Sequence, residues 1–404
     1  MTSTDIGLAG RGGDPFLAAG DQVWEEQTGI EHGWVRPATE TSVASKSLNS
    51  NLADAKKAKE DEFYTQLPDI ERELRHYKKH FKGQVVYCNC DDPRVSNFFH
   101  YFSYSFEELG LKRLIATCYK NQDADLFSQN NSEKAIFLEY NGDKNHNMVP
   151  DPSEIGVQPL EGNGDFRSPE SIELLKQADI VVTNPPFSLF REFVTLLNKH
   201  DKKFILVGNQ NAISYKEIFR LIQEDKMWLG NHNGDMSFRV PDSYPPRETR
   251  FWVDEEGKKW RSLGNACWFT NLDIAKRHEN LILYRTYSPE EYPTYDNYDA
   301  IEVARVADIP ADYDGVMGVP LTFLDKYNPE QFEILGLSGL DYPRTKNYGT
   351  KERVVDGVRQ KSNTGTLGCV VRTDTFGAGT HFDVGYPVRG IYRRLFIRRK
   401  GAVS

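Results

Sequence analysis

The sequence has few cysteines and no long apolar run, and these two absences argue against several classes of protein. Its five cysteines among 404 residues are an odd number, and no two of them form a CxxC pair. A disulfide framework or a zinc knuckle needs regular cysteine spacings, so we expect neither and predict a reducing, cytoplasmic location. No stretch approaches the roughly 18 consecutive apolar residues of a membrane-spanning helix, so we expect no membrane partner.

Two further signatures are missing. The first residues carry no basic segment followed by an apolar core, so we expect no secretory signal. His76 and His80 have helical spacing but no third ligand nearby, so we predict a solvated helix face and no metal site. With 39% apolar and 27% charged residues, the chain has what a globular protein with a hydrophobic core needs.

The net charge of −9 hides an uneven distribution of charge along the chain. Residues 342–404 contain thirteen Lys and Arg against four Asp and Glu, a balance of +9, which leaves −18 on residues 1–341. This segregation indicates a basic region that contacts nucleic acid, attached to an acidic body. A solvated basic tail without a partner would have the same composition, and charge alone leaves both interpretations open.

Residues 84–208 alternate between short apolar runs and segments of helical period. The predicted strands are Gln84–Cys90, Arg113–Tyr119, Lys134–Tyr140, Ala178–Thr183 and Lys203–Gly208, and the predicted helices are Ser96–Leu109, Pro169–Gln177 and a segment around Phe190, Phe193, Val194 and Leu197. Strands that alternate with helices of this length form βαβ units and a parallel sheet covered on both faces. We therefore predict a doubly wound α/β fold.

The segments on either side of this alternation have other patterns. Residues 1–50 are polar and lack a hydrophobic period, so we predict a flexible arm. Apolar residues at helical spacing from Ile70 to Phe81 predict one amphipathic helix that ends at Gly83. Residues 286–315 are typical of a linker or connecting loops, and the chain after Leu337 is typical of a small β-rich or irregular unit.

Smaller predictions concern single side chains. Cys88 and Cys90 are predicted to be small core residues rather than reactive thiols. Trp252, Trp260 and Trp268 are predicted to lie in the core rather than to act as base-stacking platforms.

The tetrapeptide Asn184-Pro185-Pro186-Phe187 follows the predicted strand Ala178–Thr183 directly and precedes a helix. In an open α/β sheet, ligands bind at the carboxyl ends of the strands, so a site is expected here. Two consecutive prolines remove two backbone donors and fix φ, which makes the turn stiff and lets its carbonyl groups point into a pocket. A rigid strand-exit turn without chemistry is the alternative.

Such a turn suits the methylation of an aromatic amino group. The lone pair of a nitrogen such as adenine N6 is delocalised into the ring, so the nitrogen is a poor nucleophile. If the Asn184 side-chain oxygen and the Pro185 carbonyl accept its two hydrogens, the nitrogen becomes more tetrahedral and can attack a methyl group in line. Phe187 would stack on the base, which must leave the duplex to reach the site.

These residues and several longer segments resemble a known family. The motif (D/N)PP(Y/F) marks the adenine-N6 members of the amino-directed, S-adenosylmethionine-dependent methyltransferases. The matching segments are DEFYTQ (61–66), VVYCNCDDPRVSNFF (85–99), GDFRS (164–168), ADIVVTNPPFSLF (178–190), YDNYDAI (295–301), GVMGVPLTFL (315–324) and NPEQFEI (328–334). Together they resemble the EcoRI-type DNA adenine modification methylases from about Asn51 to about Leu337, which implies a Rossmann-like methyltransferase sheet.

The resemblance also implies roles for particular residues. The cofactor-binding residues for S-adenosyl-L-methionine would be Phe63, Tyr64, Thr65, Asn89, Asp91, Asp92, Pro93, Asp165 and Phe166. The catalytic residues would be Asn184, Pro185, Pro186 and Phe187. Because the family places target recognition after the catalytic motif, we predict a flexible arm at 1–50, a catalytic domain at 51–285 and a target-recognition region at 286–404.

Three features depart from the family's pattern. The turn CNCDDPRVS (88–96) lacks the glycines that usually let the backbone approach the cofactor. The second predicted strand ends in Cys118, Tyr119 and Lys120, with no acidic residue for the ribose hydroxyls. Residues 338–388 resemble an insertion relative to the family, which would change the recognised sequence or add phosphate contacts.

A basic cluster near the end of the chain is the predicted DNA-binding surface. Its cations are Arg393, Arg394, Arg398, Arg399 and Lys400, interleaved with Tyr392, Leu395 and Phe396. We predict one basic strand that contacts phosphates. A solvated edge strand is the alternative.

The sequence therefore predicts a DNA adenine-N6 methyltransferase with a C-terminal basic target-recognition region, acting on a flipped adenine in double-stranded DNA. It would be the modification enzyme of a restriction-modification system or a phage homologue, with GAATTC as a candidate target by resemblance. We expect a monomer in a bacterial or phage-infected cell, and a cognate restriction endonuclease that shares the site without a stable complex. A catalytically silent DNA-binding protein, an RNA adenine methyltransferase and a protein glutamine methyltransferase remain open as alternatives.

Overall fold

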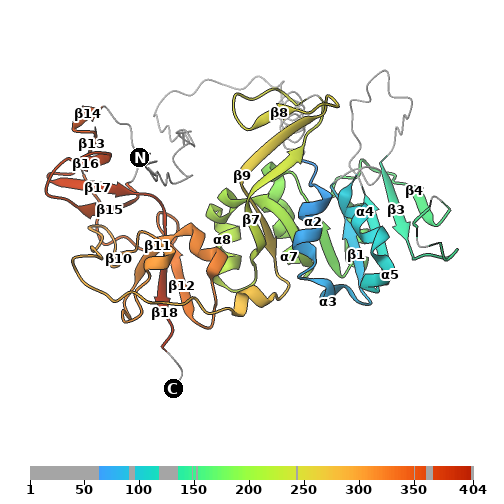
Figure 1. Ribbon diagram of the computed structural model, residues 1–404, viewed down its shortest axis with the longest axis horizontal. Coiled ribbons are helices and arrows are strands. Elements are labelled where there is room, and N and C mark those ends of the chain that lie inside the picture. The colour runs from blue at the N-terminus through green and yellow to red at the C-terminus, as the bar shows by residue number, and fades with distance from the viewer. Residues whose placement is uncertain are drawn as a thin grey trace, which may run out of the picture. The chain divides into compact units, whose positions relative to one another are not determined.

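The computed structural model describes residues 63–90, 96–117 and 135–401, apart from residues 148, 152, 243, 350 and 361–366. The predicted arm at 1–50, the residues Asp91, Asp92 and Pro93, and the end of the second predicted strand lie outside the described residues. The described part contains three β-sheets, of nine, four and five strands (Figure 1).

The nine-stranded sheet has a parallel centre and antiparallel flanks. Its strand order is β4-β3-β2-β1-β5-β6-β9-β7, and β8 pairs with β9. The parallel strands are β2 (Arg113–Thr117), β1 (Val85–Cys88), β5 (Ile180–Thr183) and β6 (Lys203–Asn209). The antiparallel strands are β3 (Ile136–Tyr140), β4 (Ile155–Pro159), β7 (Trp228–Arg239), β8 (Phe251–Val253) and β9 (Lys259–Thr270).

The predicted parallel arrangement therefore holds for the centre only. The strand predicted at Lys134–Tyr140 exists as β3, but it pairs antiparallel with β2. The flanking pairs β3–β4 and β7–β9 each join neighbours in sequence without a described helix between them, and such connections give antiparallel pairing.

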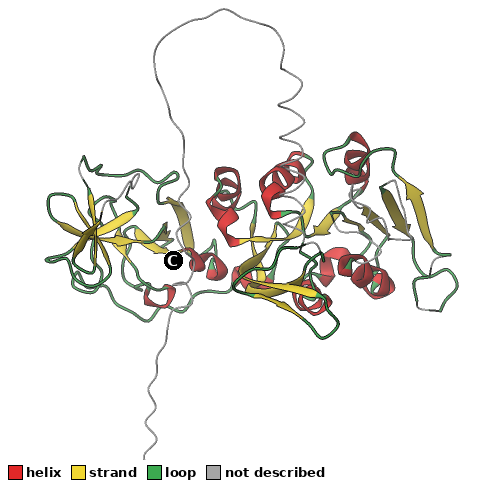
Figure 2. Cartoon of the chain, turned by 90° about the horizontal axis from the view of Figure 1, so that it is seen from above, coloured by secondary structure: helices red, strands yellow, loops and turns green. Residues whose placement is uncertain are grey.

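Helices cover both faces of this sheet, which confirms the doubly wound fold (Figure 2). On one face lie α2 (Leu67–Leu74), α3 (Lys78–Phe81), α4 (Asn97–Tyr104) and α5 (Phe106–Leu109). On the other lie α6 (Pro169–Gln177), α7 (Phe190–Lys199) and α8 (Lys216–Gln223). Each face of the sheet has its own hydrophobic core, and alternate residues of β5 contribute to each. Ile180 and Val182 pack on the first face and Val181 packs on the second.

Two helices that the sequence predicts as continuous are each divided. The apolar residues spaced from Ile70 to Phe81 are buried as predicted, but α2 ends at Leu74 and α3 begins at Lys78. Between them the Tyr77 N–H donates to the Leu74 carbonyl at 2.9 Å, a tighter turn than an α-helix makes. The predicted helix Ser96–Leu109 is likewise interrupted, at Ser105, although its apolar face is buried as predicted.

Two smaller sheets follow in the chain. The four-stranded sheet has the order β10 (Ile301–Glu302), β11 (Met317–Pro320), β18 (Arg394–Arg399), β12 (Phe332–Leu337). The five-stranded sheet has the order β14 (Val358–Gln360), β13 (Glu352–Val355), β16 (Thr380–Asp383), β17 (Pro387–Ile391), β15 (Cys369–Arg372). The β-rich alternative predicted after Leu337 is therefore the correct one.

The five-stranded sheet is an excursion from the four-stranded one. The Ser338 N–H donates to the Arg394 carbonyl at 2.9 Å, and the Arg394 N–H donates to Ser338 Oγ at 2.8 Å. The chain thus leaves the four-stranded sheet after β12 and re-enters it before β18 at one point. All five strands of the excursion lie between these two residues.

The segment predicted as a linker or connecting loops, 286–315, is packed into the core. Tyr292, Tyr295 and Tyr298 are buried, and Tyr292 belongs to the same cluster as Phe204 of the nine-stranded sheet. The described residues on both sides of the predicted boundary at 285 thus share one continuous core. The connecting-loop interpretation holds, and the linker interpretation is wrong.

Of the three tryptophans predicted for the core, Trp268 is fully buried. Trp252 is 41% exposed and Trp260 is half-buried, and their rings stack at 6.1 Å on the β8–β9 hairpin. They meet because they occupy directly opposed positions of an antiparallel pair.

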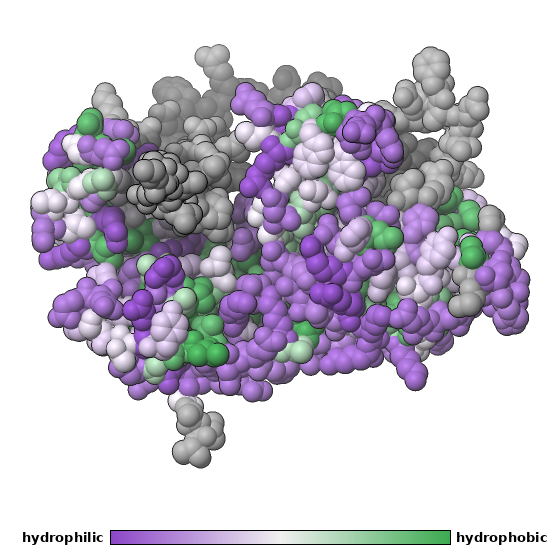
Figure 3. All heavy atoms as spheres, viewed as in Figure 1, coloured by the Kyte–Doolittle hydropathy of each residue, from purple (hydrophilic) through white to green (hydrophobic). Residues whose placement is uncertain are grey.

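In the view of Figure 3 most of the coloured surface is hydrophilic. No helix of the described residues has the length and apolar character that crossing a membrane requires.

Candidate active site

The tetrapeptide 184–187 lies at the carboxyl end of β5, in the parallel centre of the large sheet. Asn184 and Pro185 are buried, and the short 3-10 helix η2 (Phe187–Leu189) leads directly into α7. The hydroxyl of Thr183, the last residue of β5, donates to the Asn89 carbonyl just beyond β1. The ends of the two neighbouring strands are thereby tied together, as the position of the motif predicts.

Contacts to one distant segment fix the orientation of the Asn184 side chain. Its Nδ2 donates to the Phe63 carbonyl and to Thr65 Oγ1, the latter at 3.2 Å. The opposite amide orientation would place Oδ1 against the Phe63 carbonyl oxygen, so the nitrogen must face this segment. No described residue donates to Asn184 Oδ1, and the side chain is 6% exposed. The amide therefore keeps an acceptor for another partner.

The segment 63–65 packs against the turn 184–187 as well as bonding to it. The rings of Phe63 and Phe187 stack with centroids 5.2 Å apart and an angle of 26° between their planes. The Tyr64 N–H donates to the Arg239 carbonyl at 2.8 Å, and Asn97 Nδ2 donates to the Thr65 carbonyl at 2.7 Å. The structure thus brings together the predicted segments 63–65 and 184–187, which are about 120 residues apart.

The exit of β1 holds an unusual backbone and an orphaned acceptor. Cys90 has φ of +79°, a left-handed conformation that glycine adopts most easily. The turn without glycines is therefore formed with a cysteine at the strained position. Asn89 is 5% exposed, and its buried Oδ1 has no hydrogen-bond partner among the residues that the structure describes. Cys88 is buried in the core as predicted, whereas Cys90 is half-buried.

Asp165 and Phe166 lie against α7 and do not line the pocket described below. Asp165 accepts hydrogen bonds from Arg167, at 2.9 Å from Nε and 2.7 Å from Nη2. Burial raises the pKa of Asp165, but these bonds outweigh burial and lower the pKa below its ordinary value. Phe166 is buried edge-to-face against Phe193 at 5.1 Å.

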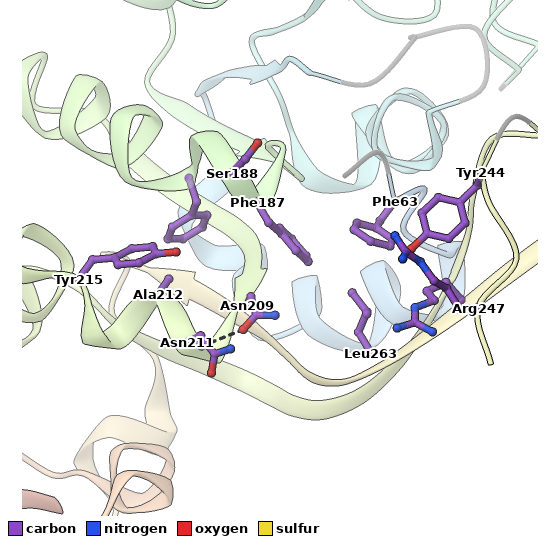
Figure 4. A pocket seen from close by; sticks show the side chains of 12 residues that line it. Phe63, Phe187, Ser188, Asn209, Asn211, Ala212, Tyr215, Tyr244, Arg247 and Leu263 are labelled. Carbon is purple, nitrogen blue, oxygen red and sulfur yellow. Dashed lines mark hydrogen bonds between the residues drawn. The ribbon is translucent and has the colours of Figure 1, made fainter. Parts of the chain in front are cut away.

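A cavity of about 400 Å³ opens beside the turn 184–187 (Figure 4). Its lining consists of Phe63, Phe187, Ser188, Phe190, Asn209, Asn211, Ala212, Tyr215, Tyr244, Arg247, Arg261 and Leu263. Tyr215 and Tyr244 lie at opposite ends, with Phe187 between them (Figure 4). Asn209 is the last residue of β6, and Arg261 and Leu263 belong to β9, so the pocket lies along the two strands that come after β5 in the sheet order.

The lining of this pocket suits a planar ring that carries polar edges and a negative charge. Its walls are aromatic, and two asparagine amides face it. Asn209 Oδ1 accepts from the Asn211 N–H at 2.8 Å and from Asn265 Nδ2 at 3.0 Å. Of the described residues, two arginines and no carboxylate line it, and the buried Arg261 Nε has no hydrogen-bond partner among them. These are the groups that a nucleotide requires.

Sequence reasoning missed most of this pocket. Asn209 follows the predicted strand Lys203–Gly208, so the strand-end argument that singles out Asn184 would also have found it. Tyr244, Arg247 and Arg261 come from the region of β7, β8 and β9. The register of β7 against β9 shifts twice, so no simple period marks these strands in the sequence.

Most of the basic cluster near the chain end belongs to a central strand, so the alternative of a solvated edge strand is wrong, and the predicted phosphate contacts stay a prediction. β18 lies between β11 and β12, with Leu395, Phe396 and Ile397 fully buried. Arg394 Nη2 contacts Glu302 Oε1 at 2.6 Å, with side chains that are 11% and 5% exposed. Arg398 pairs with Glu333 at 2.8 Å on the surface. Arg393 and Lys400 are exposed and Arg399 is half-buried.

The Arg394→Ala substitution tests whether this residue stabilises the fold. We expect the free energy of unfolding to fall by about 3–5 kcal/mol, because Glu302 would keep a buried charge without its partner. The control Arg393→Ala removes an exposed cation and should change stability by less than about 0.5 kcal/mol. Urea unfolding of both variants provides the measurement. Equal stabilities would contradict a structural role for Arg394.

The fold and the site together define a class of protein. A doubly wound, Rossmann-like sheet that carries Asn-Pro-Pro-Phe at the end of a central parallel strand, beside a nucleotide-sized aromatic pocket, is that of an amino-directed methyltransferase. A family model described as "Adenine-specific methyltransferase EcoRI" matches residues 51–376. The chain belongs to this family, which confirms the resemblance and the prediction of a site-specific adenine methyltransferase.

Three curated relatives match most of their own length. The chain is 52% identical over 297 residues to the Type II methyltransferase M.EcoRI of Escherichia coli, covering 72% of this chain and 90% of that protein. It is 42% identical over 289 residues to M.MgeORF184P of Mycoplasma genitalium, covering 70% and 84%. It is 43% identical over 287 residues to M.MpnI of Mycoplasma pneumoniae, covering 70% and 83%.

Proposed function

We propose that this protein transfers the methyl group of S-adenosyl-L-methionine to N6 of a flipped adenine within a short sequence of double-stranded DNA. One observation carries the proposal. Asn184 is held through its nitrogen at the end of β5, which leaves Oδ1 as an acceptor beside the pocket that Phe187 lines. Membership of the adenine-specific family supports the same reaction.

Asn184 and Pro185 act on the amino group of the base. Asn184 Oδ1 and the Pro185 carbonyl accept the two N6 hydrogens, so the nitrogen lone pair is drawn out of the ring and becomes nucleophilic. This interaction strengthens as positive charge develops on the nitrogen, so it lowers the barrier more than it strengthens ground-state binding. S-adenosyl-L-methionine supplies an electrophilic methyl group on a sulfonium sulfur, and each transfer releases S-adenosyl-L-homocysteine and a proton.

The residues at the exit of β1 fit the methionine part of the cofactor. Asn89 Oδ1 is a buried acceptor without a partner among the described residues, and an ammonium group is a donor that would satisfy it. Thr183 bonds to the Asn89 carbonyl at this exit, while Thr65 holds the neighbouring Asn184 and Phe63 stacks on Phe187. The cofactor roles of Tyr64, Asp91, Asp92, Pro93, Asp165 and Phe166 stay predictions, and the carboxylate of Asp165 is already engaged by Arg167.

Phe187 would stack on the flipped base, and the Phe187→Ala substitution tests this. Stacking of a base on an aromatic side chain contributes about 1–3 kcal/mol, so we expect about 5- to 150-fold weaker capture of the extrahelical base. A duplex carrying 2-aminopurine at the target position reports flipping by its fluorescence. Phe187→Tyr keeps the ring and should keep the signal. An unchanged signal in the alanine variant would exclude the stacking role.

The proposal assigns different roles to two regions of the chain. Residues 51–285 would carry catalysis and residues 286–404 target recognition, with a cognate restriction endonuclease that shares the DNA site and forms no stable complex. One methyl transfer needs one active site, so the enzyme would act as a monomer. Arg394 is left out of the DNA-binding surface because Glu302 neutralises it; Arg393, Arg398, Arg399 and Lys400 remain in it.

The direct test is a methyl-transfer assay. The purified protein is incubated with labelled S-adenosyl-L-methionine and unmethylated duplex DNA, which is then digested to nucleosides and read by mass. We expect N6-methyladenine in DNA, and sequencing of the same DNA would give the target, with GAATTC as the first candidate. Label in RNA or protein would keep the chemistry and refute the DNA substrate. Duplex binding without any transfer would leave a silent DNA-binding protein as the better interpretation.

A further inference from the structure

A second cavity, of about 220 Å³, lies where the chain passes from the four-stranded to the five-stranded sheet. Three cations line it, namely Arg344, Lys346 and Lys351, together with the polar side chains of Asn297 and Tyr348. Arg344, Lys346 and Lys351 belong to the excursion between Ser338 and Arg394, outside the predicted basic cluster. We call this cavity the basic pocket.

The basic pocket has an excess of positive charge. Among the described residues, Asp296 is the one carboxylate that forms an ion pair with this group, at 3.4 Å from Lys346 Nζ and 2.8 Å from Arg372 Nε. Arg344 and Lys351 have no carboxylate within ion-pair distance in the described part of the chain. The three cations of the basic pocket therefore have one carboxylate beside them, which also pairs with Arg372, and the pocket has a net charge of about +2.

Asp296 orders the pocket and leaves most of its positive charge uncompensated. It accepts hydrogen bonds from the hydroxyls of Tyr348 at 2.5 Å and Tyr386 at 2.6 Å. Burial raises the pKa of Asp296, but hydrogen bonds from Tyr348, Tyr386 and Arg372 outweigh burial and lower the pKa to about 2. Asp296 is thus ionised at neutral pH and fully engaged by groups that it holds in place.

Neutral acceptors hold the arginine of the pocket. Arg344 Nε donates to the Tyr298 hydroxyl at 3.1 Å and Nη2 donates to the Leu367 carbonyl at 3.3 Å. The loop itself is fixed, because the Thr345 N–H donates to the carbonyl of the buried Asn297 at 3.1 Å. Arg344 therefore presents its remaining donors in a fixed plane with its charge unpaired. This arrangement matches phosphate oxygens.

We infer that the basic pocket binds a backbone phosphate of the duplex, with Arg344 as the forked donor and Lys346 and Lys351 as point charges. This inference rests on the proposed DNA substrate. The five-stranded sheet and the β8–β9 hairpin both project toward the top of the view in Figure 1. Because β9 also lines the aromatic pocket, a duplex that delivers its base there has a path to both elements. The contact positions the duplex without reading its sequence.

The test compares two double variants that lose the same charge. Arg344→Gln with Lys351→Gln removes two proposed phosphate contacts. The control, Lys176→Gln with Arg220→Gln, removes two cations that pair with Glu173 and Glu224 on helices α6 and α8. Fluorescence anisotropy with a target duplex over a series of KCl concentrations gives Kd and its salt dependence, and thermal unfolding checks the fold of each variant.

We expect the pocket variant to bind DNA about five- to tenfold more weakly for each lost contact near 0.1 M salt, and the slope of log Kd against log salt to fall by about 2. The control variant should change the slope by less than about 0.5, because its two cations lie outside the basic pocket and pair with carboxylates on the surface, where salt screens their charge. Lys351→Gln alone leaves every hydrogen bond of Arg344 in place and should lower the slope by about 1. Equal slopes in all variants would overturn the inference.

Two further arms separate the sources of phosphate and the two proposals. In the first arm, the Tm of the wild type and of the pocket variant is measured with and without inorganic phosphate at constant ionic strength. If phosphate raises the Tm of the wild type alone, while the two proteins bind DNA with equal affinity, the pocket binds free phosphate and the duplex assignment is wrong. Methyl transfer by the wild type is measured in the same samples. Its absence from DNA refutes the proposed function, whereas transfer with unaltered salt dependence refutes only the basic pocket.

Discussion

Replacing Asn184 by alanine is expected to lower the rate of methyl transfer by about 10²- to 10³-fold while DNA and cofactor affinities change by less than about threefold. This loss of rate is the size expected when one preorganised hydrogen-bond acceptor is removed from the nitrogen on which positive charge develops. Asn184 Oδ1 is the acceptor that the contacts of Nδ2 with Phe63 and Thr65 leave over. Single-turnover methylation with saturating duplex and S-adenosyl-L-methionine separates the chemical step from binding.

Two variants make this result specific to the amide. Asn184→Asp keeps an oxygen acceptor at the same place and should retain part of the activity that the alanine variant loses. Asn328→Ala removes another fully buried asparagine, one whose amide bonds to Asn280 and to the Glu330 N–H away from the pocket, and it should leave the rate of the chemical step unchanged. Near-normal turnover by Asn184→Ala would refute the mechanism.

Excision of the five-stranded sheet is the second large effect that we expect. Replacing residues 340–391 by a short Gly-Ser linker should preserve cofactor binding and cooperative unfolding, because the chain leaves and re-enters at Ser338 and Arg394. Specific binding should fall toward non-specific affinity, a loss of at least about 10³-fold. Tm should fall by a few degrees, since Tyr295 and Tyr298 lose their cover from Cys369 and Val371.

A truncation after Leu337 provides the contrast. It also removes β18, whose Leu395, Phe396 and Ile397 are fully buried at the centre of a sheet. Each such side chain contributes about 1.5–3 kcal/mol, so the truncated chain should lose cooperative unfolding. Binding of target and scrambled duplexes by the excised protein, with Tm as the check on folding, decides the outcome. Retained discrimination between the two duplexes would remove the recognition role from this sheet.

The prediction of the fold succeeded where local patterns are strong. The four buried residues of β5, the helix Pro169–Gln177 and the alternation that sends Val181 and Val182 to opposite faces all follow from short-range periodicity. It failed at the long strands β7 and β9, which contain Gly and Asn and whose register shifts at bulges. Antiparallel flanks depend on pairing with neighbours, and the sequence of one strand does not contain that information.

The basic strand shows the limit of composition as a guide to function. Arg394 and Arg398 look equivalent in the sequence, but different neighbouring strands give them different partners. Arg394 is buried against Glu302, which is 92 residues away, whereas Arg398 meets Glu333 at the surface. By contrast, Arg344 and Lys351 in the basic pocket form no ion pair with any described carboxylate.

By itself, the sequence determined the parallel centre of the sheet, the family, and the position of Asn184 at a strand end, because each depends on residues close together in the chain. The tertiary structure alone decided that Phe63 stacks on Phe187, that Thr65 orients the Asn184 amide, and that β6, β9 and the residues between β7 and β8 line one aromatic pocket. The first two contacts join residues more than a hundred positions apart. They form only when the hydrophobic cores on the two faces of the sheet fix the elements against one another. The hydrophobic periodicity of a single segment does not predict such contacts.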